Sequence, residues 1–336
     1  MKRQIPLRRR HFRGFTFIEL LIVLAISGML LALMMSALVQ GREAARRVQC
    51  QNNLRQIGTA AQGHLTSHGI FPSGGWPGWV GVQKGGFGSS QPGGWLYSSL
   101  PYLAETSQYA LGGEETDESH RLIARRLAQP LSVVICPSRR GVRAYPVAHN
   151  DMNCDSPFPL RGKLLITVAG RGDYAGSMGS RYFNVMATSE GLSVRPAENR
   201  SYSNGMFFIQ SEVSDRHVTD GLSKTYLVGE KYLDSEQYET GNGNGDCESM
   251  YAGFGLSNAR AAGNSIVGTS NNWLPMRDGV GGNERLVFGS AHPTCWFVVM
   301  CDGSVRAIGY DIDEQTHRQL SDRNDGGMGS KSGSSE

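Results

Sequence analysis

The stretch that decides the fold is residues 8–35, RRRHFRGFTFIELLIVLAISGMLLALMM. It opens with a cluster of basic side chains, and from Phe15 to Val39 the only side chain that can ionise is Glu19. As a helix rising ~1.5 Å per residue, this apolar run is longer than the ~30 Å hydrocarbon layer of a bilayer. The segment therefore predicts a single membrane-spanning helix over residues 15–40.

Basic residues before this segment predict its orientation. The first fourteen residues contain six of them and no acid: Lys2, Arg3, Arg8, Arg9, Arg10 and Arg13. Positive flanks stay in the cytoplasm, so we expect a single-pass protein of the inner (cytoplasmic) membrane whose C-terminal domain is periplasmic or extracellular. A secretory signal peptide is the alternative, but its apolar region is usually 7 to 15 residues, by the general description of such peptides. Setting these six cations aside changes the net charge from +3 to −3, so no nucleic acid partner is expected.

Glu19 needs an explanation, because an unpartnered acid inside the bilayer costs ~2.5 to 3.5 kcal/mol. The segment from Gly14 to Glu19, GFTFIE, resembles the leader junction of type IV pilins and type II secretion pseudopilins. The resemblance implies that a prepilin peptidase cuts between Gly14 and Phe15 and methylates the new amino terminus of Phe15, while the helix stays in the membrane. Glu19 would then neutralise the Phe15 ammonium group of a neighbouring subunit.

Residues 42–68 carry apolar side chains at intervals of three and four, which predicts an amphipathic extension of the same helix that ends at His68 and Gly69. REAARRVQCQNNLRQIGTAAQGH, followed by GIFPSGG, resembles the start of a large group of pilin-like exported proteins of undefined biochemical function. That group ends in a His-x9-Asp-Gly motif, which this chain matches with His292 and Asp302-Gly303. The group usually has two glycines after its His-Pro, where this chain has Thr294-Cys295.

We predict an α+β, pilin-like fold, in which the long N-terminal helix packs on an antiparallel β-sheet with long Gly-rich loops. The expected segments are a cytoplasmic leader (1–14), a transmembrane helix (15–40), its amphipathic extension (41–69), an exported domain (70–324) and a disordered tail (325–336). A further helix is expected over 119–128. The predicted strands are 131–136, 164–168, 205–210, 225–230, 286–289, 295–300 and 305–309.

His292 and Asp302 look like a paired site when the motif is written out, but the pattern predicts that they do not touch. Residues 295–300 are all apolar, which is typical of a strand buried on both faces. Asp302-Gly303 suits a two-residue hairpin turn, and the return strand would then bring Asp313 opposite His292, or Asp311 with a slip of two. We interpret the motif as a structural clasp.

Other polar and sulfur-containing residues give weaker indications. Six cysteines in an exported domain can form disulfides, and a helix-to-sheet pair of Cys50 and Cys136 is a hypothesis because both fall inside the family-like motifs. No C-x2-C pair exists, so no structural zinc site is predicted. Glu230 follows an apolar strand and is interpreted as a surface charge. The loop 241–249, GNGNGDCES, is interpreted as a flexible loop or a calcium site formed by Asn242, Asn244, Asp246 and Glu248.

No recognised catalytic motif is present, so the chain is not predicted to be an enzyme, and no cofactor is expected. The leading hypothesis is a structural prepilin or pseudopilin-like subunit of a secretion or pilus-like machine. Its partners would be the membrane, the prepilin peptidase and other pilin-like subunits. The alternative is a membrane-anchored domain that binds an envelope ligand and uses the pilin signal only for sorting. An exported hydrolase would need a pocket with converging His and acid groups.

Overall fold

The computed structural model describes residues 15–76, 82, 85–113, 116–147, 166–180, 203–243, 245–262, 273–281 and 287–325. The predicted leader with Gly14, the predicted ligand Asn244 and the tail from residue 326 lie outside the described residues. The chain divides into two compact units, Met1–Arg46 and Arg47–Glu336, and each is described by itself.

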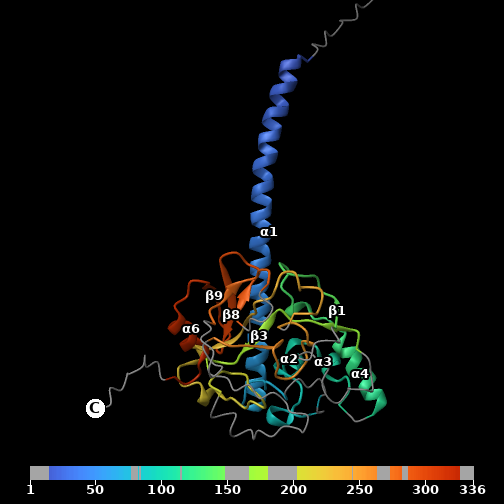
Figure 1. Cartoon of the computed structure of the whole chain (residues 1–336), viewed down its shortest axis with the longest axis vertical. Coiled ribbons are helices and arrows are strands. Elements are labelled where there is room, and N and C mark those ends of the chain that lie inside the picture. Colours follow the sequence, from blue (N-terminus) through green and yellow to red (C-terminus); the bar gives the residue numbers. More distant parts are fainter. Residues whose placement is uncertain are drawn as a thin grey trace, which may run out of the picture. The chain divides into compact units, whose positions relative to one another are not determined.

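The described elements run from one long helix through short helices to a small set of strands (Figure 1). The α-helices are α1 (Phe17–His68), α2 (Trp95–Ser99), α3 (Thr106–Tyr109), α4 (Asp117–Leu127) and α6 (Glu314–Ser321). The strands are β1 (Ala144–Pro146), β2 (Val168–Gly170), β3 (Tyr174–Ser177), β4 (Tyr226–Glu230), β5 (Ala259–Arg260), β6 (Met276–Arg277), β7 (Gly289–Ser290), β8 (Cys295–Met300) and β9 (Val305–Gly309). Short 3-10 turns lie at Gly88–Ser90, Leu100–Leu103, Ser132–Val134, Asp215–His217 and Leu222–Lys224.

Helix α1 begins at a capping box. The Thr16 backbone N–H and hydroxyl both donate to Oε2 of Glu19 at 2.8 Å, and the Glu19 N–H donates back to the Thr16 hydroxyl oxygen. The helix runs without a break to His68, and Gly69 ends it with a positive φ of 73°, as predicted. Its first part exposes large apolar side chains all round, and within the described residues α1 is the helix long and apolar enough to cross a membrane.

The main sheet of the second unit has five strands in the order β5-β3-β4-β8-β9. Three of its neighbouring pairs are antiparallel, whereas β3 and β5 are parallel, so the sheet is mixed rather than purely antiparallel. A register shift between Tyr226 and Val228 bends β4 against β8. Two small two-stranded sheets, β1-β2 and β6-β7, complete the strands of the described residues.

The part of α1 inside the second unit runs along β8. Arg47 donates to Sγ of Cys295 at 2.9 Å, a Cβ on Gly58 would lie 2.5 Å from Cγ2 of Val299, and Gln62 donates to the Cys301 carbonyl. Fifteen helical residues span about 22 Å and six strand residues about 20 Å, so the helix and the strand keep in step. One face of α1 and the odd-numbered side chains of β8 therefore form the main core.

The opposite face of β8 packs under α6. Trp296, Val298 and Met300 form a second core with Tyr226 and Phe288, and Ile308, Tyr310 and Leu320 pack against it. Every residue of β8 is buried, which confirms the prediction of a strand covered on both sides. The second unit thus has a helix on each face of the sheet.

The β8-β9 hairpin forms as predicted, but its register differs by one residue. Trp296 pairs with Ile308 and Val299 with Val305, so the loop is one residue longer than the two-residue turn expected. Gly303 has a φ of 86°, whereas Asp302 stays at negative φ and its carboxylate accepts from Ser304. A turn of this kind with one left-handed glycine replaces the turn with two positive φ angles.

Two predicted strands are wrong. Residues 131–136 form a 3-10 turn at Ser132–Val134 followed by extended chain, and residues 205–210 form turns in which Gln210 has a φ of 56°. Both segments are apolar because they are buried, but neither pairs as a strand. The Ile135 carbonyl accepts from Asn53 and the Cys136 N–H donates to Asp173, while the Met206 and Phe207 N–H groups both donate to the Ser177 carbonyl at the end of β3. The predicted 225–230, 295–300 and 305–309 match β4, β8 and β9. The short strands β1, β3, β5 and β6 were not predicted.

The contact between Gly58 and Val299 gives a test of the helix-to-sheet packing. Alanine favours a helix over glycine by about 1 kcal/mol, so helix propensity alone predicts stabilisation for Gly58→Ala. The clash with a stiff valine beneath the helix costs about 1 to 3 kcal/mol, so we expect Gly58→Ala to lower the free energy of unfolding. The control is Gly41→Ala in the same helix, where an added Cβ meets no atom within 4 Å. Chemical unfolding of the full chain in detergent measures both, and equal stability of the two variants would contradict the packing.

Candidate functional site

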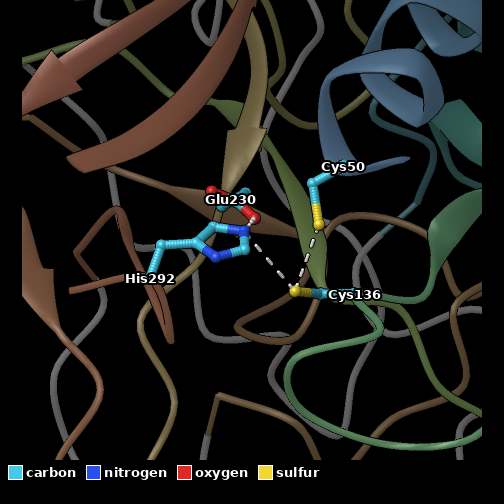
Figure 2. A group of neighbouring side chains, drawn as sticks. All are labelled: Cys50, Cys136, Glu230 and His292. Carbon is cyan, nitrogen blue, oxygen red and sulfur yellow. Dashed lines mark hydrogen bonds and ion pairs between the residues drawn. The ribbon is translucent and has the colours of Figure 1, made fainter. Parts of the chain in front are cut away.

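Four side chains of the kinds that bind metals or carry redox chemistry meet inside the second unit (Figure 2). Cys50 lies on the buried face of α1, Cys136 follows the 3-10 turn at 132–134, Glu230 ends β4, and His292 lies between β7 and β8. All four residues have no exposed surface. Four segments that are far apart in the sequence therefore meet at one buried position in the core.

The distances within this group, the Cys50/Cys136/Glu230/His292 cluster, are short. The two sulfur atoms lie 3.2 Å apart, Sγ of Cys136 lies 3.9 Å from Nε2 of His292, and the same Nε2 lies 3.4 Å from Oε1 of Glu230. One possible ligand atom from each residue falls within 4.8 Å of the other three. The side chains point toward one another in Figure 2.

Backbone groups and buried side chains hold the cluster in place. The Phe297 N–H of β8 donates to Oε2 of Glu230 at 2.9 Å, and the Cys136 N–H donates to Oδ2 of Asp173 at 2.7 Å. Asn53, one turn along α1 from Cys50, donates to the Ile135 carbonyl at 3.1 Å. Glu230 is therefore oriented by β8, and the segment that carries Cys136 is held by Asp173 and by α1.

The cluster carries a proton on His292. Burial lowers the pKa of the His292 imidazole, but hydrogen bonds to Cys136 and Glu230 outweigh burial and raise that pKa to about 10. The hydrogen bond from Cys50, together with burial, raises the pKa of the Cys136 thiol well above its usual value. As described, the group holds two free cysteines and an imidazole with a raised pKa beside Glu230.

This geometry does not match a cysteine-histidine catalytic triad. In such a triad the nucleophile and the orienting carboxylate contact different ring nitrogens, whereas Cys136 and Glu230 both lie nearest Nε2 of His292. A buried thiol with a raised pKa is also a poor nucleophile. The arrangement is suited instead to holding a metal ion or to forming a disulfide between the two sulfurs.

The structure moves His292 away from its predicted partner. Asp313 caps α6, where its carboxylate accepts from the Thr316 N–H at 2.9 Å, and His292 meets Glu230 instead. The cause is that β9 ends at Gly309 and the chain then turns into α6, so Asp313 does not lie on a strand opposite His292. Tyr310 closes the open end of the hairpin by donating to the His292 carbonyl at 2.7 Å.

Asp302 and Gly303 lie in the β8-β9 turn, and Cys50 and Cys136 come together as free thiols. The disulfide between these two cysteines stays a prediction. Phe15 and Glu19 lie at the start of α1 in the first unit.

In the loop predicted as a possible calcium site, Asp246 forms buried ion pairs. Asp246 is buried and accepts from Arg140 and from Nζ of Lys231 at 2.9 Å, so its carboxylate faces two cations rather than a metal ion. Lys231 also donates to the Gly245 and Ser257 carbonyls. The loop is therefore fastened by buried ion pairs.

Asp173 joins this buried ion-pair network to the cluster. Its Oδ1 accepts from Arg140 at 2.5 Å while its Oδ2 accepts from the Cys136 N–H. Sequence analysis missed Asp173, and it interpreted Glu230 as a surface charge although the residue is completely buried. The available signal was the sequence YLVGEK, in which an acid and a base directly follow a fully apolar strand with no alternation.

Comparison with known proteins gives two matches. Residues 9–35 match the prokaryotic N-terminal methylation motif. An apolar helix that begins with this motif and continues into an α+β domain defines a pilin-like protein. Residues 39–315 match a family described as protein of unknown function (DUF1559), and the chain belongs to that family. No curated protein and no solved structure matches.

Replacing Asp173 tests the link between the ion-pair network and the cluster. Removing one partner of a buried ion pair costs about 3 to 5 kcal/mol, so we expect Asp173→Asn to lower the free energy of unfolding by about that amount. Asp215→Asn is the matched control, because Asp215 is exposed and its carboxylate accepts from the N–H of the adjacent Arg216. It should change stability by less than about 0.5 kcal/mol. Similar unfolding curves for both variants would contradict the assigned role of Asp173.

Proposed function

We propose that this chain is a structural prepilin-type subunit that is processed, anchored by α1 and assembled with other pilin-like subunits in a secretion or pilus-like machine. The observation that carries the proposal is the methylation motif over 9–35, which includes the start of a helix long enough to span a membrane. The peptidase removes the leader after Gly14, methylates Phe15, and leaves the domain on the non-cytoplasmic side of the inner membrane. The basic leader supports this orientation.

Glu19 has two roles in this proposal. Within one chain it completes the capping box with Thr16. Between chains it neutralises the amino terminus that cleavage creates at Phe15, so that two charges which are costly in lipid become one pair. The capping role needs only a hydrogen-bond acceptor, whereas the assembly role needs a negative charge.

The amino terminus of the membrane-extracted protein tests processing. We expect intact mass and N-terminal sequencing to show a chain that starts at Phe15 and carries one added methyl group. A bulky residue at the cleavage position should block the peptidase, so Gly14→Val should keep the leader and still insert. Wild-type protein that retains Met1 in cells with an active peptidase would refute this proposal.

Two substitutions separate the roles of Glu19. Glu19→Gln keeps the acceptor and Glu19→Ala removes it, but both remove the charge, so both should reduce crosslinked multimers more than tenfold if the lost pairing is worth about 3 kcal/mol. Membrane insertion, measured by carbonate extraction, should persist in both. Normal multimers with Glu19→Gln and none with Glu19→Ala would assign Glu19 to the helix cap alone. Normal multimers in both would show that assembly does not use Glu19, and an absence of multimers even in the wild type would favour a monomeric anchored domain.

A further inference from the structure

The Cys50/Cys136/Glu230/His292 cluster presents two sulfurs, an imidazole nitrogen and a carboxylate oxygen to a common point. Four-coordinate zinc takes these donors at about 2.3 Å for sulfur and about 2.0 to 2.2 Å for nitrogen or oxygen. A tetrahedron with those bond lengths places two sulfurs about 3.8 Å apart, sulfur and nitrogen about 3.6 Å apart, and nitrogen and oxygen about 3.4 Å apart. The observed separations of 3.2, 3.9 and 3.4 Å need shifts of only a few tenths of an ångström.

Burial and hydrogen bonding favour a metal site over a disulfide between Cys50 and Cys136. A disulfide would use the two sulfurs and leave Glu230 and His292 as a buried ion pair beside a neutral bond, at a cost in desolvation. Oε1 of Glu230 is buried, and its contact with Nε2 of His292 is long at 3.4 Å, compared with about 2.7 to 2.9 Å for a charge-assisted hydrogen bond. A bound cation satisfies this oxygen, the imidazole and both sulfurs at once.

The surroundings of the donors fit a closed structural site. The Phe297 N–H occupies Oε2 of Glu230 and leaves Oε1 as the atom nearest His292. Asp173 holds the backbone of Cys136, and Tyr310 holds the carbonyl of His292. Second-shell hydrogen bonds of this kind orient ligands before the metal arrives. Because all four residues are buried, no position is open to a substrate.

We propose that Cys50, Cys136, Glu230 and His292 bind one zinc ion, which fastens α1 to the end of β4 and to the segment before β8. Binding releases three protons to solvent, one from each thiol and one from Nε2 of His292, with no change in oxidation state. The ion joins the helix that carries the membrane-spanning segment to the sheet of the exported domain. Mixed sulfur and nitrogen donors in a four-coordinate arrangement favour zinc over calcium or magnesium.

The test begins with the full chain extracted from membranes in detergent without chelator. Half of the sample is denatured at neutral pH with a chelator and an alkylating reagent and mapped, which shows whether Cys50 and Cys136 are free or joined. The other half is analysed for metals by mass spectrometry, before and after equilibration with zinc and removal of the excess. We expect about one zinc ion per chain and two alkylated thiols. Replacing zinc with cobalt should give the absorption bands of thiolate-bound cobalt.

Variants identify the ligands. Cys136→Ser and His292→Gln should each weaken zinc binding at least about tenfold, as measured by competition with a chelator, and Glu230→Gln should weaken it while keeping the shape of the side chain. Cys301→Ser is the matched control, because Cys301 is also a free, fully buried cysteine but lies outside the cluster, and it should bind zinc as the wild type does.

Three outcomes would overturn the proposal. They are a Cys50–Cys136 disulfide in the extracted protein, free thiols that take up no zinc, and equal zinc binding by wild type, Cys136→Ser and Glu230→Gln. If a ligand variant does not fold, the cobalt spectrum of the wild type still decides, because bands without thiolate character place the metal elsewhere. Tight binding of another metal by the same four residues would overturn the choice of zinc.

Discussion

The close approach of α1 to β8 is the constraint on which the rest of the second unit depends. Gly58 has no side chain, so the helix comes within contact distance of Val299 and of the turn at Gly303. Because the helix and the strand advance at matching rates, the contact extends from Cys295 to Cys301. This packing buries Cys50 and brings it to Cys136, so the cluster exists only while the helix lies on the sheet.

Helix α1 is continuous, but its pattern of apolar and polar side chains changes along its length. Up to Val39 it is apolar on every side, which suits lipid, and from Cys50 it presents an apolar stripe to the sheet and polar side chains elsewhere. The change in pattern occurs without a proline or a break in hydrogen bonding.

The parts of the fold that could be predicted from sequence are those set by periodicity. Apolar spacing and turn residues predict the long apolar helix, its end at His68, and the strands β8 and β9. Apolar spacing gives the wrong prediction where a segment is buried but does not pair with another strand, as at Ser132–Val134. Apolar spacing also does not predict the register of a hairpin to the residue, because one extra residue in the loop changes every facing pair.

The cluster was less accessible to sequence analysis than the anchor. Its four members come from segments separated by up to 242 positions along the chain, and no local spacing marks them as ligands. Cys50 and Cys136 were paired by resemblance and His292 was noted for its motif, but Glu230 looked like an exposed charge. Their meeting depends on long-range packing, which a single sequence does not reveal.

Residues 50–62 of α1 belong to the folded core of the domain as fully as β8 does. Hydrogen exchange of the full chain in detergent measures this directly, because amides in one cooperative unit share one free energy of opening. We expect the amides of this helical segment and those of Trp296 to Val299 to exchange together, only through global unfolding. Rapid exchange along the helical segment while β8 stays protected would contradict the account.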